Sequence, residues 1–126
     1  MPILVYEYQK CSTCQKALKY LDGKKVSYKR LPIVDTPPSE TELRKMLGFL
    51  KTRGESFKKL FNTSGEKYRE LKIGDKIKAG MNEDEALKLL AGNGRLIKRP
   101  FLLTDNDGVV GFKEEEWKEI LRPARN

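Results

Sequence analysis

The residues best suited to chemistry in this chain are its two cysteines, Cys11 and Cys14, which form a Cys-x-x-Cys pair. Two thiols at this spacing can pass between a dithiol and a disulfide, so the pair can exchange electrons with other thiols. The chain contains no histidine. Catalysis by histidine is therefore excluded, and cysteine and histidine alone cannot supply the four ligands of a structural zinc site. The sequence predicts thiol–disulfide chemistry without a metal.

The pair lies where a strand is expected to end and a helix to begin. Residues 3–8 are apolar and rich in strand-forming side chains, and apolar residues then recur at helical spacing at Ala17, Leu18 and Leu21. Free N–H groups and the helix dipole favour a thiolate at the start of such a helix, and Lys10 and Lys16 add positive charge nearby. We therefore expect Cys11 to be the nucleophile.

Cys14 lies about one helical turn after Cys11, so it can attack a mixed disulfide formed on Cys11 and resolve it. Three other interpretations of the pair stay open. A structural disulfide would close a very short loop and remove little chain entropy, and a zinc half-site would need ligands from a second chain. Two buried, inert cysteines would act as small apolar residues. The strand-to-helix position favours redox activity.

The order of the remaining elements predicts the fold. Val26, Tyr28 and Leu31 alternate with polar residues and indicate a second strand parallel to the first, after a helix that Gly23 is expected to stop. Residues 39–91 read as short helices, of which the first begins with a capping box at Ser39. Glycines, Gly74 among them, are expected to separate these helices.

After the helical region the strand pattern returns. It is expected over residues 100–104 and 109–112, joined by an Asp-Gly hairpin turn at Gly108, and a final helix carries Trp117 into the core. The prediction is one α/β domain over residues 1–126. It has a thioredoxin-like mixed sheet, made of a parallel strand–helix–strand unit and a C-terminal β-hairpin, with a helical insertion over about residues 39–91 between the halves.

The composition limits the cellular compartment and the classes of partner that we expect for this protein. The chain has 126 residues, a net charge of +8 and 38% hydrophobic residues. No run reaches the ~18–20 apolar residues of a membrane span, and the first residues lack the pattern of a secretion signal, so we expect a cytoplasmic protein with no membrane partner. The basic residues are spread along the chain without a DNA-binding motif. We do not expect sequence-specific nucleic-acid binding by this chain alone.

Arg99 and Pro100 form a second candidate element, directly before the strand of the hairpin. In thioredoxin-like domains the corresponding proline is cis and faces the cysteine pair, and this resemblance predicts a cis peptide bond here. An ordinary trans proline at a strand entry is the alternative. A cis bond would hold Arg99 beside Cys11, where its charge can stabilise a thiolate or bind an oxyanion.

Four segments together resemble the ArsC/Spx family of arsenate-reductase-related proteins, over nearly the whole chain. They are residues 8–17 around the cysteines, residues 61–65 (Phe-Asn-Thr-Ser-Gly), residues 96–100 (Leu-Ile-Lys-Arg-Pro) and residues 110–112 (Val-Gly-Phe). The resemblance implies a thioredoxin-like fold. In the enzymes of the family it implies a cysteine that attacks arsenate, with no bound cofactor and with electrons from glutathione and glutaredoxin or from thioredoxin.

Carried over by position, Cys11 matches the nucleophile of the family and Arg99 the arginine of its Arg-Pro motif. Ser12, Thr13 and Pro100 join Arg99 as candidate substrate- or oxyanion-binding residues. The resemblance also places Asn62 and Phe112 where arsenate reductases carry two further oxyanion-binding arginines, and Gln15 where they carry a basic residue. An arsenate dianion would lose charge-assisted hydrogen bonds worth ~1.5–3 kcal/mol each, so efficient arsenate reduction is not expected.

The second cysteine resembles the Spx-type branch of the family, whose members sense oxidation by forming a disulfide and bind RNA polymerase through the C-terminal domain of its α-subunit. Gly54 lies near the glycine that serves the polymerase contact in that branch, although a glycine there is also explained by a helix C-cap. The sequence thus favours a thiol–disulfide redox protein that reacts with small thiols or a thioredoxin or glutaredoxin system. The alternative is a redox-sensing, non-enzymatic regulator that binds RNA polymerase, and a third is a true arsenate reductase.

Overall fold

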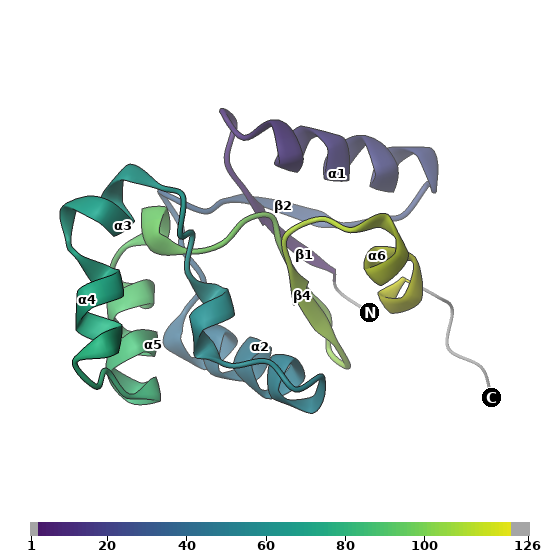
Figure 1. The fold of residues 1–126 in the computed structure, drawn as a ribbon. Helices are drawn as coiled ribbons and strands as arrows, with labels where there is room; N and C mark the ends of the chain where they lie inside the picture. The colour runs from purple at the N-terminus through teal and green to yellow at the C-terminus, as the bar shows by residue number, and fades with distance from the viewer. Residues whose placement is uncertain (1–2, 122–126) are drawn as a thin grey trace.

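A computed structural model describes residues 3–121, and its centre is a four-stranded sheet (Figure 1). The strands are β1 (Leu4–Glu7), β2 (Lys29–Pro32), β3 (Phe101–Leu103) and β4 (Gly108–Val110), in the spatial order β2-β1-β3-β4. β1 pairs with β2 in parallel, whereas β1 with β3 and β3 with β4 pair antiparallel. This confirms the predicted thioredoxin-like mixed sheet, with its parallel strand–helix–strand unit and its C-terminal hairpin.

Helices α1 (Ser12–Gly23) and α6 (Glu114–Ile120) cover one face of the sheet. Their apolar side chains pack on alternate residues of the strands, as the period of two along a strand requires. The cluster comprises Val5, Ala17, Leu18, Leu21, Leu102, Val109 and Trp117. The buried Trp117 ring also donates its Nε1–H to the carbonyl oxygen of Gly111 at 2.9 Å, so its polar atom is satisfied.

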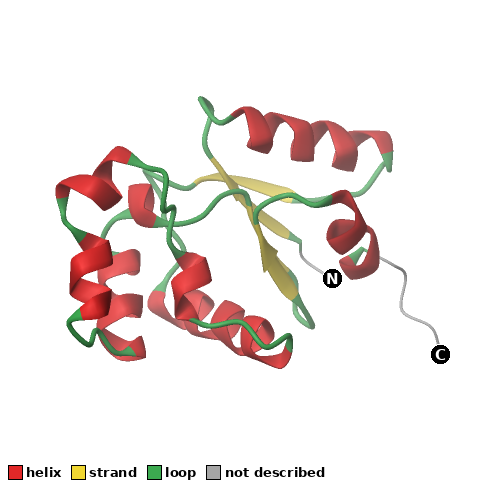
Figure 2. Cartoon of the chain, in the orientation of Figure 1, coloured by secondary structure: helices red, strands yellow, loops and turns green. Residues whose placement is uncertain are grey.

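The helical insertion covers the other face, as Figure 2 shows by the helices on both sides of the strands. It contains α2 (Glu40–Thr52), the 3₁₀ turn η1 (Phe57–Leu60), α3 (Glu66–Glu70), α4 (Ile73–Lys78), α5 (Glu83–Ala91) and the 3₁₀ turn η2 (Gly94–Leu96). The predicted capping box is present: the Ser39 hydroxyl accepts from the N–H of Glu42 at 3.1 Å, and the Glu42 carboxylate accepts from the N–H of Ser39 at 3.0 Å. Tyr6 and Phe101 of the sheet join the core of the insertion.

Helix α1 ends at Gly23, as predicted, and the left-handed turn that follows falls on Lys25, with φ of 56°. Two other local predictions were wrong in their details. Gly74 lies inside helix α4, where the fully buried Ile73 anchors the segment. Gly108 is the first residue of β4 rather than part of a turn, and a Cβ there would lie 2.8 Å from the sulfur of Met46. Its role is to let the sheet approach α2.

Within residues 3–121 no helix is both long and apolar enough to cross a membrane. In the same part of the chain, no group of three or more cysteine, aspartate and glutamate side chains could hold a metal ion.

Candidate functional site

The two cysteines lie at the junction of β1 and α1, where the chain turns out of the sheet. The N–H of Cys11 donates to the carbonyl oxygen of Tyr8 at 3.0 Å, which closes the turn. Cys11 is the N-cap of α1, with extended backbone angles of −99° and 111°, and its sulfur accepts the N–H of Cys14 at 3.3 Å. A side chain in this position faces the free N–H groups of the first helical turn, which is where a protein helix binds an anion.

Cys14 lies one turn further along α1, on the face that packs against the sheet. Its side chain is fully buried, whereas Cys11 is partly exposed, and both are free thiols. Burial, together with the smaller effect of a hydrogen bond with Cys11, raises the pKa of the Cys14 thiol to about 12, while the positive charge of Arg99 acts in the opposite direction. Cys14 is therefore a protonated thiol near neutral pH, held within reach of the Cys11 sulfur.

Arg99 reaches the site from the residue pair that leads into β3, the antiparallel neighbour of β1. The Arg99–Pro100 peptide bond is cis, as predicted. The guanidinium carbon of Arg99 lies 4.6 Å from the ring centroid of Tyr8, and its Nη1 donates to the carbonyl oxygen of Arg95 at 3.5 Å. Because Tyr8 also forms the turn that holds Cys11, the arginine is positioned directly beside the cysteine loop. Its predicted action on Cys11 itself stays a prediction.

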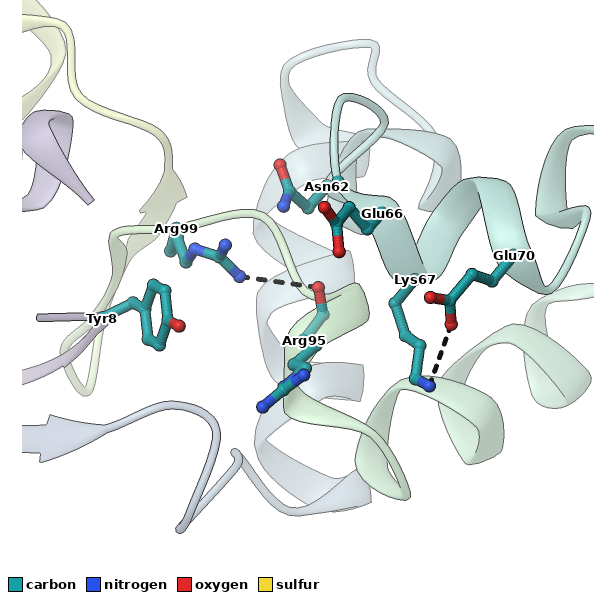
Figure 3. A pocket seen from close by; sticks show the side chains of 8 residues that line it. Tyr8, Asn62, Glu66, Lys67, Glu70, Arg95 and Arg99 are labelled. Carbon is teal, nitrogen blue, oxygen red and sulfur yellow. Dashed lines mark hydrogen bonds and ion pairs between the residues drawn. The ribbon is translucent and has the colours of Figure 1, made fainter. Parts of the chain in front are cut away.

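A pocket of about 210 Å³ opens beside Tyr8 (Figure 3). Tyr8, Arg95 and Arg99 line it together with Asn62 and with Gly65, Glu66, Lys67 and Glu70 of the α3 segment. Lys67 and Glu70 form an ion pair of 3.1 Å across one turn, so their charges offset each other. Arg95 was not among the candidate residues predicted from the sequence. It joins the site because the short turn η2 passes α3, and no sequence spacing signals that approach.

The other candidate residues are distributed around the cysteine loop. Ser12 and Thr13 are exposed in the first turn of α1, and Lys10 and Lys16 are exposed on either side of the pair. Pro100 is buried behind the loop that carries Arg99. Their roles in substrate binding stay predictions.

The three positions at which the family resemblance predicts basic side chains, arginines at 62 and 112 and a basic residue at 15, differ in their surroundings. Asn62 lines the same pocket as Arg99. Phe112 instead packs into the apolar layer beside α1. The centroid of its ring lies 5.1 Å from that of Trp117 and 5.6 Å from that of Tyr20. Gln15 donates its side-chain amide to the carbonyl oxygen of Gln9 at 3.3 Å, which braces the cysteine loop. None of these three side chains carries a charge.

Gly54 lies outside this site, at the C-terminal end of α2. Its φ of 79° is left-handed, and its N–H donates to Lys51 while the N–H of Glu55 donates to Leu50, both at 3.0 Å. This is a Schellman motif, in which glycine is the usual residue. The helix cap therefore explains Gly54, and a Cβ there would meet no atom within 4 Å, so its outer side is open.

Comparison with known proteins gives a consistent result. Residues 6–120 match the sequence model of the ArsC family. YusI of Bacillus subtilis is 46% identical over 120 residues, which cover 94% of this chain and 98% of that protein. The crystal structure of an ArsC family related protein from Bacteroides fragilis is 43% identical, with a TM-score of 0.87 over 95% of this chain and 98% of that one.

More distant relatives carry functional names. An arsenate reductase of Neisseria meningitidis is 25% identical over 122 residues, covering 94% of this chain and 97% of that protein. A global transcriptional regulator of Bacillus anthracis, Spx 2, is 23% identical over 119 residues, covering 94% of this chain and 86% of that protein. The sequence identities of these two relatives, 25% and 23%, are well below the 46% and 43% of YusI and the Bacteroides fragilis protein.

Proposed function

The chain belongs to the ArsC family, and we propose that within it the protein is a thiol–disulfide redox protein that works through Cys11 and Cys14. The observation that carries the proposal is the pairing of the two thiols. Cys11 caps the helix at a partly exposed position with an N–H directed at its sulfur, and the buried Cys14 lies against it as a protonated thiol. This is the arrangement that one attacking and one resolving thiol require.

The reaction consists of two exchanges. The Cys11 thiolate attacks one sulfur of a substrate disulfide R–S–S–R, forms a Cys11–S–S–R mixed disulfide and expels R–S⁻, which takes a proton from solvent. Cys14 then loses its proton, bonds to the Cys11 sulfur and expels the second R–S⁻. Two electrons pass from the dithiol to the substrate, and two R–SH molecules leave. A small thiol or a thioredoxin or glutaredoxin system supplies the two electrons that restore the dithiol.

The direct test is a count of thiols during oxidation by a small disulfide. We expect the reduced protein to fall from two free thiols to none, and to form a disulfide within one chain rather than between chains. Mass spectrometry after alkylation measures this as the loss of both alkylation sites without added mass from the oxidant. Dimers linked by Cys11, or a Cys14 that stays free after complete oxidation of Cys11, would contradict the proposal.

A redox-dependent transcriptional regulator is the second candidate, favoured by the relatives named Spx and by the open outer side of Gly54. In this case oxidation of the cysteine pair would change affinity for a partner, and the partner to test is the C-terminal domain of the RNA polymerase α-subunit. A pull-down with that domain, with and without oxidant, separates the candidates. Binding that depends on oxidation supports the regulator, and absence of binding in both states argues against it.

Arsenate reduction is the weakest candidate. Of the three arginine positions expected in arsenate reductases, only Arg99 carries the guanidinium, because Asn62 and Phe112 occupy the other two. Phe112 also packs in an apolar layer against the ring of Trp117 and supplies no charge to an oxyanion. Thiol consumption that depends on arsenate would revive this candidate.

A further inference from the structure

The pocket beside Tyr8 contains two guanidinium groups that differ in how they are held. Arg99 is half-buried and fixed by the Tyr8 ring and by the carbonyl oxygen of Arg95. Arg95 is exposed, and among residues 3–121 its guanidinium has no hydrogen-bond or ion-pair partner. A planar, permanently charged group left unpaired next to a second one is suited to binding a carboxylate or another oxyanion.

The acidic residues of the pocket do not cancel this charge. Glu70 is paired with Lys67. Glu66 at the start of α3 is exposed, and its carboxylate has no ion-pair partner within the described part of the chain. The unpaired charges that face the pocket are therefore two positive, on Arg95 and Arg99, and one negative, on Glu66. The pocket therefore has a net positive charge, which attracts an anion. The negative charge of Glu66 weakens this attraction.

The size and position of the pocket say which part of a substrate it can receive. Its volume of about 210 Å³ is below the ~300–1,000 Å³ of sites that enclose a drug-sized ligand, so it fits one group rather than a whole molecule. Tyr8 links the pocket to the redox pair, because its ring lines the pocket while its carbonyl oxygen accepts the N–H of Cys11. The pocket and the reacting cysteine therefore share Tyr8 as a common neighbour.

We propose that this pocket binds the negatively charged group of a disulfide substrate and that Arg95 is the residue that sets the preference for it. The inference rests on the proposed redox function and adds the substrate class: small disulfides that carry a carboxylate near the sulfur. Arg99 supplies a guanidinium held in a fixed position, and Arg95 supplies the guanidinium that distinguishes an anionic substrate from a neutral one. The carboxylate of Glu66 reduces the attraction of both for an anion.

The test compares two aromatic disulfides, dithiobis(nitrobenzoate), which carries a carboxylate on each ring, and neutral dithiodipyridine. The second-order rate constant of the reduced protein with each is measured by the absorbance of the released thiol. Arg95→Gln should slow the reaction with the anionic disulfide about fivefold, the size of one exposed ion pair, and leave the neutral one unchanged. Glu66→Gln should raise the anionic rate about twofold, again without effect on the neutral one.

Two variants and one salt condition separate a local contact from net charge. Arg44→Gln removes the same charge from an exposed arginine of α2 that pairs with Glu40 and Asp84 and does not line the pocket, so it should leave the ratio of the two rates unchanged. Arg95→Lys keeps the charge and should keep most of the preference. Salt near ~1 M should remove the difference between wild type and Arg95→Gln, because it shortens the screening length to ~3 Å.

The outcomes are distinct. An unchanged ratio in Arg95→Gln, an equal loss with both disulfides, or an equal shift in Arg44→Gln would overturn the assignment of Arg95 while leaving the dithiol chemistry intact. If the Cys11→Ser variant reacts with either disulfide at the wild-type rate, the proposed redox function itself is wrong. The cysteine variant therefore distinguishes a failure of the redox proposal from a failure of the Arg95 assignment.

Discussion

Replacing Cys11 by serine is expected to abolish the reaction of the reduced protein with dithiodipyridine while helix α1 stays in place. Serine is a preferred N-cap residue, so its hydroxyl can accept the N–H of Cys14 as the sulfur does at 3.3 Å. A serine hydroxyl does not attack disulfides at neutral pH. Cys14 cannot replace the lost thiol, because its side chain is fully buried and burial raises its pKa to about 12. Stopped-flow absorbance measures the rate, and circular dichroism checks the helix.

The matched variant Cys14→Ser keeps the attacking thiol and removes the resolving one. It should release one equivalent of thiol rather than two and accumulate a stable mixed disulfide on Cys11, which mass spectrometry detects as the mass of the bound half of the reagent. Because a hydroxyl at this buried position has to find a hydrogen-bond partner, Cys14→Ala serves as the second variant with the same expected stoichiometry. Rapid release of both equivalents from either Cys14 variant would show that Cys14 is not the resolving thiol.

The parts of the fold that were predicted from the sequence depend on signals between near neighbours. The capping box at Ser39 is formed with Glu42, only three positions later in the sequence. The cysteine pair lies within the first turn of α1, so its position at a helix start is also a local feature. The parallel pairing of β1 and β2 follows because a helix joins them. The sequence signals for these features lie within one helix start or one strand–helix–strand unit.

The features that were missed depend on packing between distant segments. Gly74 lowers helix propensity by only ~1 kcal/mol, which the burial of Ile73 in the insertion outweighs. Gly108 looks like a turn glycine, yet it lies in β4 against the side chain of Met46, which no local pattern connects to it. Arg95 follows the same rule, because it becomes part of the site only where η2 meets α3 and the loop of Tyr8. Sequence spacing therefore located the cysteine pair but not the pocket beside Tyr8.

Gly94 at the start of η2 is expected to be the glycine least able to accept a side chain. A Cβ at this position would overlap the carbonyl oxygen of Ile33 and lie 2.8 Å from the Ile33 carbonyl carbon and 3.0 Å from the Cα of Val34. All three are backbone atoms, so no side chain can rotate away, and the chain of η2 or of the segment after β2 has to move. Overpacking of this kind costs about 3 kcal/mol, at the upper end of the usual range.

The measurement is urea unfolding of Gly94→Ala beside Gly92→Ala, two residues earlier in the chain. At Gly92 a Cβ would meet only carbonyl oxygens of its own helix region at 3.5 Å and 3.7 Å, which is ordinary contact, and its φ of −85° suits alanine. We therefore expect Gly92→Ala to unfold within ~0.5 kcal/mol of wild type, and Gly94→Ala to unfold at much lower urea. Because η2 carries Arg95 and leads to Arg99, the folded fraction of Gly94→Ala should also lose part of its preference for the anionic disulfide. Equal unfolding midpoints for the two alanine variants would mean that η2 does not approach the segment after β2 this closely in solution.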